Sequence, residues 1–230
     1  GCTSLKNTIE RIQENIELAQ RRGGYNHPVQ FIAVTKTRTA SQIKNCYDAG
    51  IKTIGENRIQ EADKKFKSFD FMPGLTKRFI GHLQSNKVKK CIEIFDTIDA
   101  VDSVGLAQKI NIKAKTLNKT IPTLLEINTS GEPQKHGFKP DQIEEMLLCV
   151  EASNLNVTGL MTVGPRTENK EKIRTAFVKL RKLRGVLNNK NPQTVLTDLS
   201  MGMSGDYEIA AEEGSTMVRV GTALFGKRKS

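Results

Sequence analysis

Short apolar runs typical of buried strands alternate with amphipathic segments along most of this chain. Eight strand-like runs occur, and each except the last is clearly followed by a helical pattern. They cover residues 30–36, 51–55, 78–83, 96–101, 122–129, 156–163, 194–200 and 216–221. Helical patterns follow from 39, 57, 85, 103, 140, 169 and 206. Several runs are almost continuously apolar, as in strands buried on both faces, so the pattern predicts β–α units around a parallel sheet.

Eight consecutive β–α units close most simply into a (β/α)8 TIM barrel. An open doubly wound sheet is the competing architecture, and it is disfavoured because no dinucleotide-type glycine fingerprint follows the first strand. Residues 4–22 carry Leu5, Ile12 and Ile16 on one face, which predicts an extra N-terminal helix outside the barrel. No linker or repeat interrupts the chain, so we expect a single α/β domain over residues 1–230.

The composition argues against a disordered, a membrane-spanning or an exported protein. The 230 residues are 37% hydrophobic and 27% charged, which is typical of a folded globular domain. No apolar run is long enough for a transmembrane helix, and the first ten residues lack the apolar centre of a signal peptide. The four cysteines form no Cys-x-x-Cys pair, which fits a reducing compartment. We therefore expect a cytoplasmic protein without a membrane partner.

The net charge of +11 permits an anionic ligand or partner. The basic residues are dispersed, however, and within residues 179–190 they lie between leucines at helical spacing, as on a solvated helix face. The chain has three tyrosines and no tryptophan, so few side chains could stack on bases. We expect no nucleic-acid partner.

Lys36 is the sharpest candidate for chemistry. It follows Thr35 and the apolar run 31–34, at the carboxyl end of the first strand, where barrels carry their functional residues. Desolvation there would lower the pKa of the amine and make it a nucleophile toward a carbonyl. A lysine at this position can also simply reach solvent or pair with an acid such as Glu56.

Two glycine-rich turns suit a phosphate. Residues 200–206 read SMGMSGD before a predicted helix, and residues 219–226 read RVGTALFG. Backbone N–H groups and hydroxyls in such turns bind anions, and the loops after strands seven and eight are a frequent phosphate site in barrels. Ordinary turn chemistry explains the same residues, because glycine and serine are common turn formers.

A reactive lysine beside a phosphate site indicates a phosphorylated aldehyde, of which pyridoxal 5′-phosphate is the common one. Arg219 is the candidate partner of its ring nitrogen. Because arginine only donates hydrogen bonds, that nitrogen would stay unprotonated and the ring would be a weak electron sink. The alternative for Arg219 is an ion pair inside the barrel with Glu126 or Asp198.

Several segments closely resemble the pyridoxal phosphate homeostasis protein family, also called proline synthetase co-transcribed homologues. The resemblance extends from about residue 5 to 228 and is most specific in 80-IGHLQSNK-87 and 199-LSMGMSGD-206. The other matching segments are 33-AVTKT-37, 55-GENRIQE-61, 126-EINTSGEPQKHG-137, 159-GLMTVGP-165 and 207–226.

The resemblance implies the barrel of the alanine racemase N-terminal domain and an imine between the cofactor and Lys36. It implies phosphate contacts from Ser204, with Ser200 nearby, and from Gly221 and Thr222. It also implies that Arg219 faces the ring nitrogen. Three further residues are implied near the ring, namely Asn57, His82 and Met161.

The first functional hypothesis is a carrier that binds pyridoxal 5′-phosphate, buffers it and passes it to apo-enzymes, as the resemblance implies for vitamin B6 and amino-acid homeostasis. Racemases of this type need a second base, and the chain ends at Ser230, which leaves no residues for the domain expected to supply it. A weak racemase-like enzyme using His82 or Tyr207 is the alternative. A regulatory protein with a basic binding surface is a third possibility. We expect a monomer.

Overall fold

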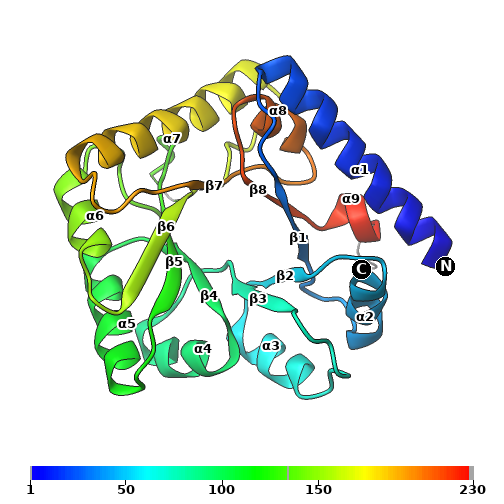
Figure 1. Cartoon of the computed structure of the whole chain (residues 1–230), viewed down its shortest axis with the longest axis horizontal. Coiled ribbons are helices and arrows are strands. Elements are labelled where there is room, and N and C mark those ends of the chain that lie inside the picture. The colour runs from blue at the N-terminus through cyan, green and yellow to red at the C-terminus, as the bar shows by residue number, and fades with distance from the viewer. Residues whose placement is uncertain (1, 134, 228–230) are drawn as a thin grey trace.

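The computed structural model describes residues 2–133 and 135–227 and confirms the predicted barrel (Figure 1). Eight parallel strands pair in chain order, and β8 pairs with β1 to close the sheet. The strands are β1 (Gln30–Val34), β2 (Thr53–Glu56), β3 (Thr76–Phe79), β4 (Thr97–Val101), β5 (Ile121–Glu126), β6 (Leu155–Met161), β7 (Asp198–Ser200) and β8 (Met217–Val220).

Helices form the outer layer (Figure 1). They are α1 (Cys2–Gly23), α2 (Ala40–Asp48), α3 (Ile59–Phe66), α4 (Val88–Ile94), α5 (Val104–Thr116), α6 (Ile143–Val150), α7 (Lys170–Lys190), α8 (Tyr207–Glu212) and α9 (Thr222–Phe225), with a 3₁₀ turn at Ser85–Lys87. Within the described ranges, no helix has the length and apolar character needed to cross a bilayer.

The apolar side chains explain this layering. Most of the buried ones lie between the strands and the surrounding helices, in one cluster around α4–α7 and another around α1, α2 and α8. A third, smaller cluster joins residues of five different strands, which can meet only inside the barrel; it contains Ile32, Ala100, Leu124, Met161 and Met217. The strands are therefore buried on both faces, as their composition predicts.

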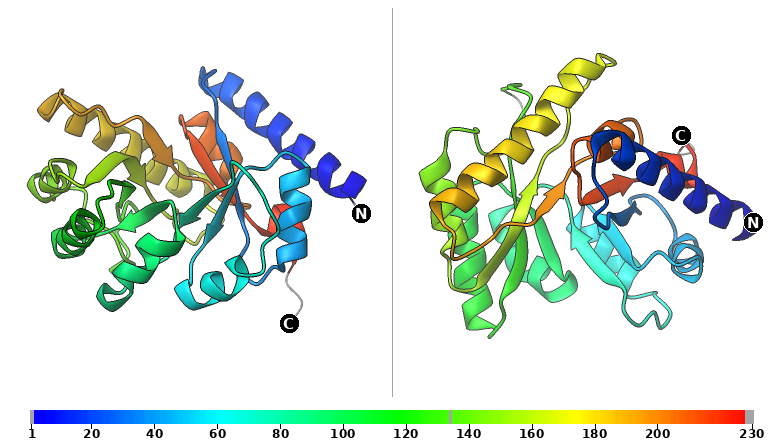
Figure 2. Two further views of the ribbon diagram at one scale, coloured as in Figure 1. Left: turned by 60° about the horizontal axis from the view of Figure 1, so that its bottom comes forward. Right: turned by 45° about the horizontal axis from the view of Figure 1, so that its top comes forward.

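Helix α1 lies outside the barrel across α8 and α9, as expected from its apolar face (Figure 2). Ile12 and Ile16 are buried in this contact region. The Asn15 side-chain amide donates a hydrogen bond of 3.0 Å to the Tyr207 hydroxyl on α8. Tyr207 is thus part of the contact between α1 and the barrel.

The structure differs from the sequence prediction at some boundaries. The third strand is Thr76–Phe79 rather than 78–83, because the chain turns at Gly81, where a Cβ would lie 2.3 Å from the Asn57 carbonyl oxygen. The helix expected from Pro140 begins at Ile143, since a turn first joins Gln142 N–H to the Lys139 carbonyl at 3.0 Å. The short helix α9 was not predicted.

The cysteines with described side chains are packed in the interior. Cys46, Cys91 and Cys149 are buried and free. Burial raises the pKa of the Cys46 thiol to about 12 and that of Cys149 to about 11, so these groups stay protonated and unreactive near neutral pH.

Candidate functional site

Lys36 lies just beyond the carboxyl end of β1, where the backbone is fixed by the neighbouring strand. The Thr35 N–H donates to the Gly55 carbonyl at 3.0 Å, and the Thr35 hydroxyl donates to the Glu56 carboxylate. Thr37 has a φ of 64°, a left-handed conformation that is uncommon for threonine. The chain therefore leaves the barrel in a sharp, well-anchored turn at Lys36.

Lys65 of α3 completes this anchor. Its ammonium group donates to the Glu56 carboxylate at 2.7 Å, to the Thr35 carbonyl at 2.8 Å and to the Glu61 carboxylate at 3.0 Å. Burial raises the pKa of Glu56, and the hydrogen bonds from Lys65 and Thr35 partly oppose that shift. Glu56, the acid considered as a partner of Lys36, is thus ion-paired with Lys65. No local sequence pattern indicates this role of Lys65.

The loops that follow β7 and β8 meet at Ser204. Its hydroxyl oxygen accepts hydrogen bonds from the Gly221 N–H at 3.2 Å and the Ala223 N–H at 3.0 Å. In the same loop the Met203 N–H donates to the Asp206 carboxylate at 2.7 Å. The two glycine-rich turns predicted from the sequence are therefore joined through the Ser204 hydroxyl.

Arg219 of β8 is buried inside the barrel. Its guanidinium donates to the Ser200 hydroxyl at 2.7 Å and to the Thr162 carbonyl at 2.8 Å. Burial lowers the pKa of Arg219, while the negative charges of Asp99, Glu126 and Asp206 oppose that shift. Glu126 and Asp198 are both described, and neither forms an ion pair with Arg219, unlike the alternative considered for it.

One cavity of about 300 Å³ joins these elements. Five of the nine predicted residues line it: Lys36, Ser204, Arg219, Gly221 and Thr222. The other lining residues are Val34, Arg38, Met203 and Gly205. The wall thus combines three cationic side chains and two hydroxyls with two apolar side chains, and it includes no carboxylate. This donor set fits a small anionic ligand that also carries a carbonyl and an apolar ring.

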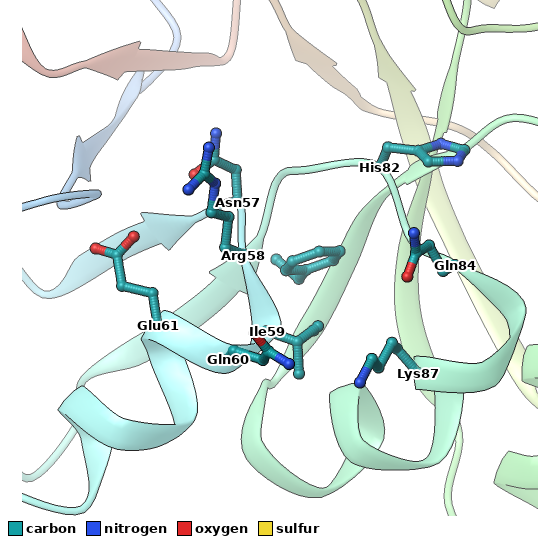
Figure 3. A pocket seen from close by; sticks show the side chains of 9 residues that line it. Asn57, Arg58, Ile59, Gln60, Glu61, His82, Gln84 and Lys87 are labelled. Carbon is teal, nitrogen blue, oxygen red and sulfur yellow. The ribbon is translucent and has the colours of Figure 1, made fainter.

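The other predicted residues lie elsewhere. Asn57 and His82 line a neighbouring cavity of about 450 Å³, together with Arg58, Gln84 and Lys87 (Figure 3). The Asn57 side-chain oxygen is buried there without a hydrogen-bond partner among the described residues. Ser200 is fully buried behind Arg219, and Met161 belongs to the apolar cluster inside the barrel.

Arg38 is a lining residue that the sequence analysis missed. Its guanidinium donates to the Gly226 carbonyl at 2.7 Å and lies 5.0 Å from the centre of the Phe225 ring. Its position two residues after Lys36 was the available signal, because it places a second cation on the same strand-to-helix loop.

Comparison with known proteins shows the family to which this chain belongs. A family model described as the alanine racemase N-terminal domain matches residues 8–229. A pyridoxal phosphate homeostasis protein of Aquifex aeolicus is 40% identical over 230 residues, which are 100% of this chain and 99% of that protein. This chain belongs to the pyridoxal phosphate homeostasis protein family.

A further curated relative and two solved structures also match this chain. The human pyridoxal phosphate homeostasis protein is 35% identical, with 99% of this chain and 86% of that protein covered. The solved structure of PipY from Synechococcus elongatus with PLP bound has a TM-score of 0.86 and 34% identity, covering 96% of this chain and 100% of that one. An alanine racemase of Clostridium difficile (TM-score 0.75, 18% identity, 97% and 58% covered) shares the fold.

Proposed function

We propose that this chain binds pyridoxal 5′-phosphate covalently at Lys36, buffers it, and delivers it to apo-enzymes in vitamin B6 and amino-acid homeostasis. The observation that carries the proposal is the cavity that joins Lys36 to Ser204, Arg219 and Thr222 without a carboxylate in its wall. The names of the family relatives and the PLP-bound structure of PipY support it.

The cofactor, when bound, supplies an aldehyde that can condense with a primary amine. Lys36 is the lining residue that carries one. The hydroxyls of Ser204 and Thr222 would donate to the phosphate beside Gly221, because all three residues line the cavity where the two loops meet. The Gly221 and Ala223 N–H groups donate to the Ser204 hydroxyl oxygen and so position that hydroxyl.

Arg219 would face the ring nitrogen from inside the barrel. Its contacts with Ser200 and Thr162 fix the guanidinium plane. A guanidinium donates hydrogen bonds and accepts none, so it would leave the ring nitrogen unprotonated. That arrangement weakens the ring as an electron sink, which suits a protein that holds its cofactor or chemistry with a poorly stabilised carbanion.

The positions of the tyrosines disfavour the racemase-like alternative. All three lie in the described ranges, and none of them lines the cavity. The Tyr207 hydroxyl accepts a hydrogen bond from Asn15 of α1, and the Tyr47 hydroxyl donates to the Pro73 carbonyl. His82 lines the neighbouring cavity. A proton donor must lie within hydrogen-bond reach of the reacting atom, and neither His82 nor Tyr207 lines the cavity that contains Lys36, which argues against the alternative.

Borohydride reduction of the protein loaded with pyridoxal 5′-phosphate tests the attachment. We expect a single stable mass adduct located on Lys36 by peptide mapping. Lys36→Ala should abolish it, and Lys89→Ala, an exposed lysine on α4, should keep it. An adduct on another lysine, or no adduct, would contradict the proposal.

Delivery is tested with an apo-aminotransferase. Loaded protein is mixed with the apo-enzyme while the absorbance of the lysine-bound cofactor and the recovered transamination activity are recorded together. Delivery predicts that activity appears faster than with the same concentration of free cofactor in solution. Equal rates would leave the protein with storage alone.

A further inference from the structure

Three potential metal ligands come together on the opposite side of the barrel mouth from Lys36. His82 follows β3, Asp102 directly follows β4, and His136 lies in the loop after β5. Parallel neighbouring strands bring their carboxyl ends to the same edge, so three loops converge here. Neither Asp102 nor His136 was identified from the sequence.

The three side chains face one another without direct hydrogen bonds between them. His82 Nδ1 lies 3.6 Å and His136 Nδ1 lies 3.8 Å from Asp102 Oδ2. The two imidazole rings are stacked with their centres 4.0 Å apart and their planes at 10°. The Asp102 side chain is 13% exposed, and those of His82 and His136 are 46% and 58% exposed.

These distances are close to those required around one ion. Two ligands bound tetrahedrally to zinc at about 2.0–2.1 Å lie about 3.3 Å apart. The observed nitrogen–oxygen separations of 3.6 and 3.8 Å are about 0.3 and 0.5 Å longer than this. Coordination requires the parallel rings to turn so that both nitrogens point at the ion, and two half-exposed side chains can make that rotation.

We propose that His82, Asp102 and His136 bind a first-row divalent transition metal ion of the zinc class at the mouth of the barrel. Two imidazole nitrogens and one carboxylate oxygen are a donor set that such ions accept. Three protein ligands leave the remaining coordination positions to water or a small anion. The proposed metal site does not depend on the cofactor function, although the family resemblance also implies His82 near the cofactor ring.

The test uses untagged, cofactor-free full-length protein with Cys2→Ser, because a thiol could bind the same ions. Co²⁺ is titrated while its d–d absorption is recorded, and Zn²⁺ is then added in competition. We expect one ion per chain, a spectrum without a thiolate-to-cobalt charge-transfer band, and displacement by Zn²⁺.

Ligand variants then locate the ion. His82→Ala, His136→Ala and Asp102→Asn should each weaken binding at least tenfold, since losing even the partner of a ligand costs about 10–100-fold. His27→Gln changes the chain's remaining histidine, which lies elsewhere and contacts the Ser215 carbonyl, and should bind normally. His136→Ala affects an exposed side chain, so its folding, checked by circular dichroism, should be unchanged.

No binding at millimolar Co²⁺, or binding unchanged in folded His136→Ala, would overturn the metal site. Borohydride trapping of the cofactor in the same His136→Ala protein keeps the two proposals separate. A normal Lys36 adduct with lost Co²⁺ binding is the expected result, whereas a lost adduct with normal Co²⁺ binding would count against the cofactor proposal alone.

Discussion

The two sides of the barrel mouth are built alike but differ in charge. On the side of β1, β7 and β8, the cavity wall carries Lys36, Arg38 and Arg219 and no carboxylate. On the side of β3, β4 and β5, Asp102 lies between two histidines. Each strand end adds its own loop, so one scaffold can present an anion site and a cation site on the same face.

The carboxylates near the cationic side are kept away from its cavity. Glu56 is paired with Lys65 beneath the turn of Lys36, and Asp206 accepts a hydrogen bond from the Met203 N–H within the loop after β7. Neither lines the cavity. An anion site therefore depends on where acids are placed and neutralised as well as on where cations point.

The largest expected effect comes from Lys65→Met, which breaks the anchor beneath the cationic side. It leaves Glu56 buried and unpaired, and removing one partner of a buried ion pair costs about 3–5 kcal/mol. We expect that loss in urea unfolding, together with slower formation of the Lys36 adduct. Lys64→Met, the exposed neighbour on α3, is the control and should have little effect. Normal stability of Lys65→Met would show that the anchor is unimportant.

Ser204→Ala should have an intermediate effect that is limited to the cationic side. It removes the hydroxyl on which Gly221 and Ala223 converge, and a hydrogen bond to a charged group contributes about 1.5–3 kcal/mol. We expect the Kd for pyridoxal 5′-phosphate, measured by absorbance titration, to rise roughly 10- to 100-fold. Ser130→Ala, in the loop after β5, should leave it unchanged. Equal effects of the two changes would remove the distinction between the sides.

Asp206→Asn should change the free energy of unfolding least, and the size of that change should depend on pH. Burial raises the pKa of Asp206 in the folded protein, and the hydrogen bond from Met203 partly opposes this. The folded state then holds its proton to higher pH than the unfolded state. The free energy of unfolding therefore falls as pH rises from the ordinary aspartate pKa through the raised one.

Asparagine has no carboxyl group to ionise, and its side-chain oxygen can still accept the hydrogen bond from the Met203 N–H. Its stability relative to the parent should thus increase with pH across that window and then level off. Urea unfolding at a series of pH values measures this. Asp141→Asn, which changes an exposed aspartate, provides the baseline. A relative stability that falls with pH would reverse the assigned direction of the shift.

Much of the fold follows from local patterns. The apolar runs predict all eight strands, because a strand buried on both faces must be apolar almost throughout. The single apolar face of α1 predicts a helix that packs against the outside of the barrel. Boundaries were harder: β3 ends early because Gly81 meets the backbone of Asn57, a contact between separate loops that no local pattern contains.

For the candidate site, too, some features follow from local sequence and others depend on distant residues. Strand-end position and turn chemistry alone point to Lys36, Ser204, Arg219 and Thr222, since these depend on residues adjacent in the chain. Other features depend on residues far apart in the sequence. Lys65 anchors the end of β1 from α3, and His136 stacks on His82 from another loop.

The series of β–α units, the family and the lysine expected to carry the cofactor can all be derived from the order of residues along the chain. The folded arrangement was needed to show which predicted residues share a cavity, which acids are neutralised near it, and that two histidines meet Asp102. The physical reason is that hydrophobic periodicity and turn preference are local, whereas ion pairs, burial and ligand clusters depend on which strand ends the closed barrel brings together.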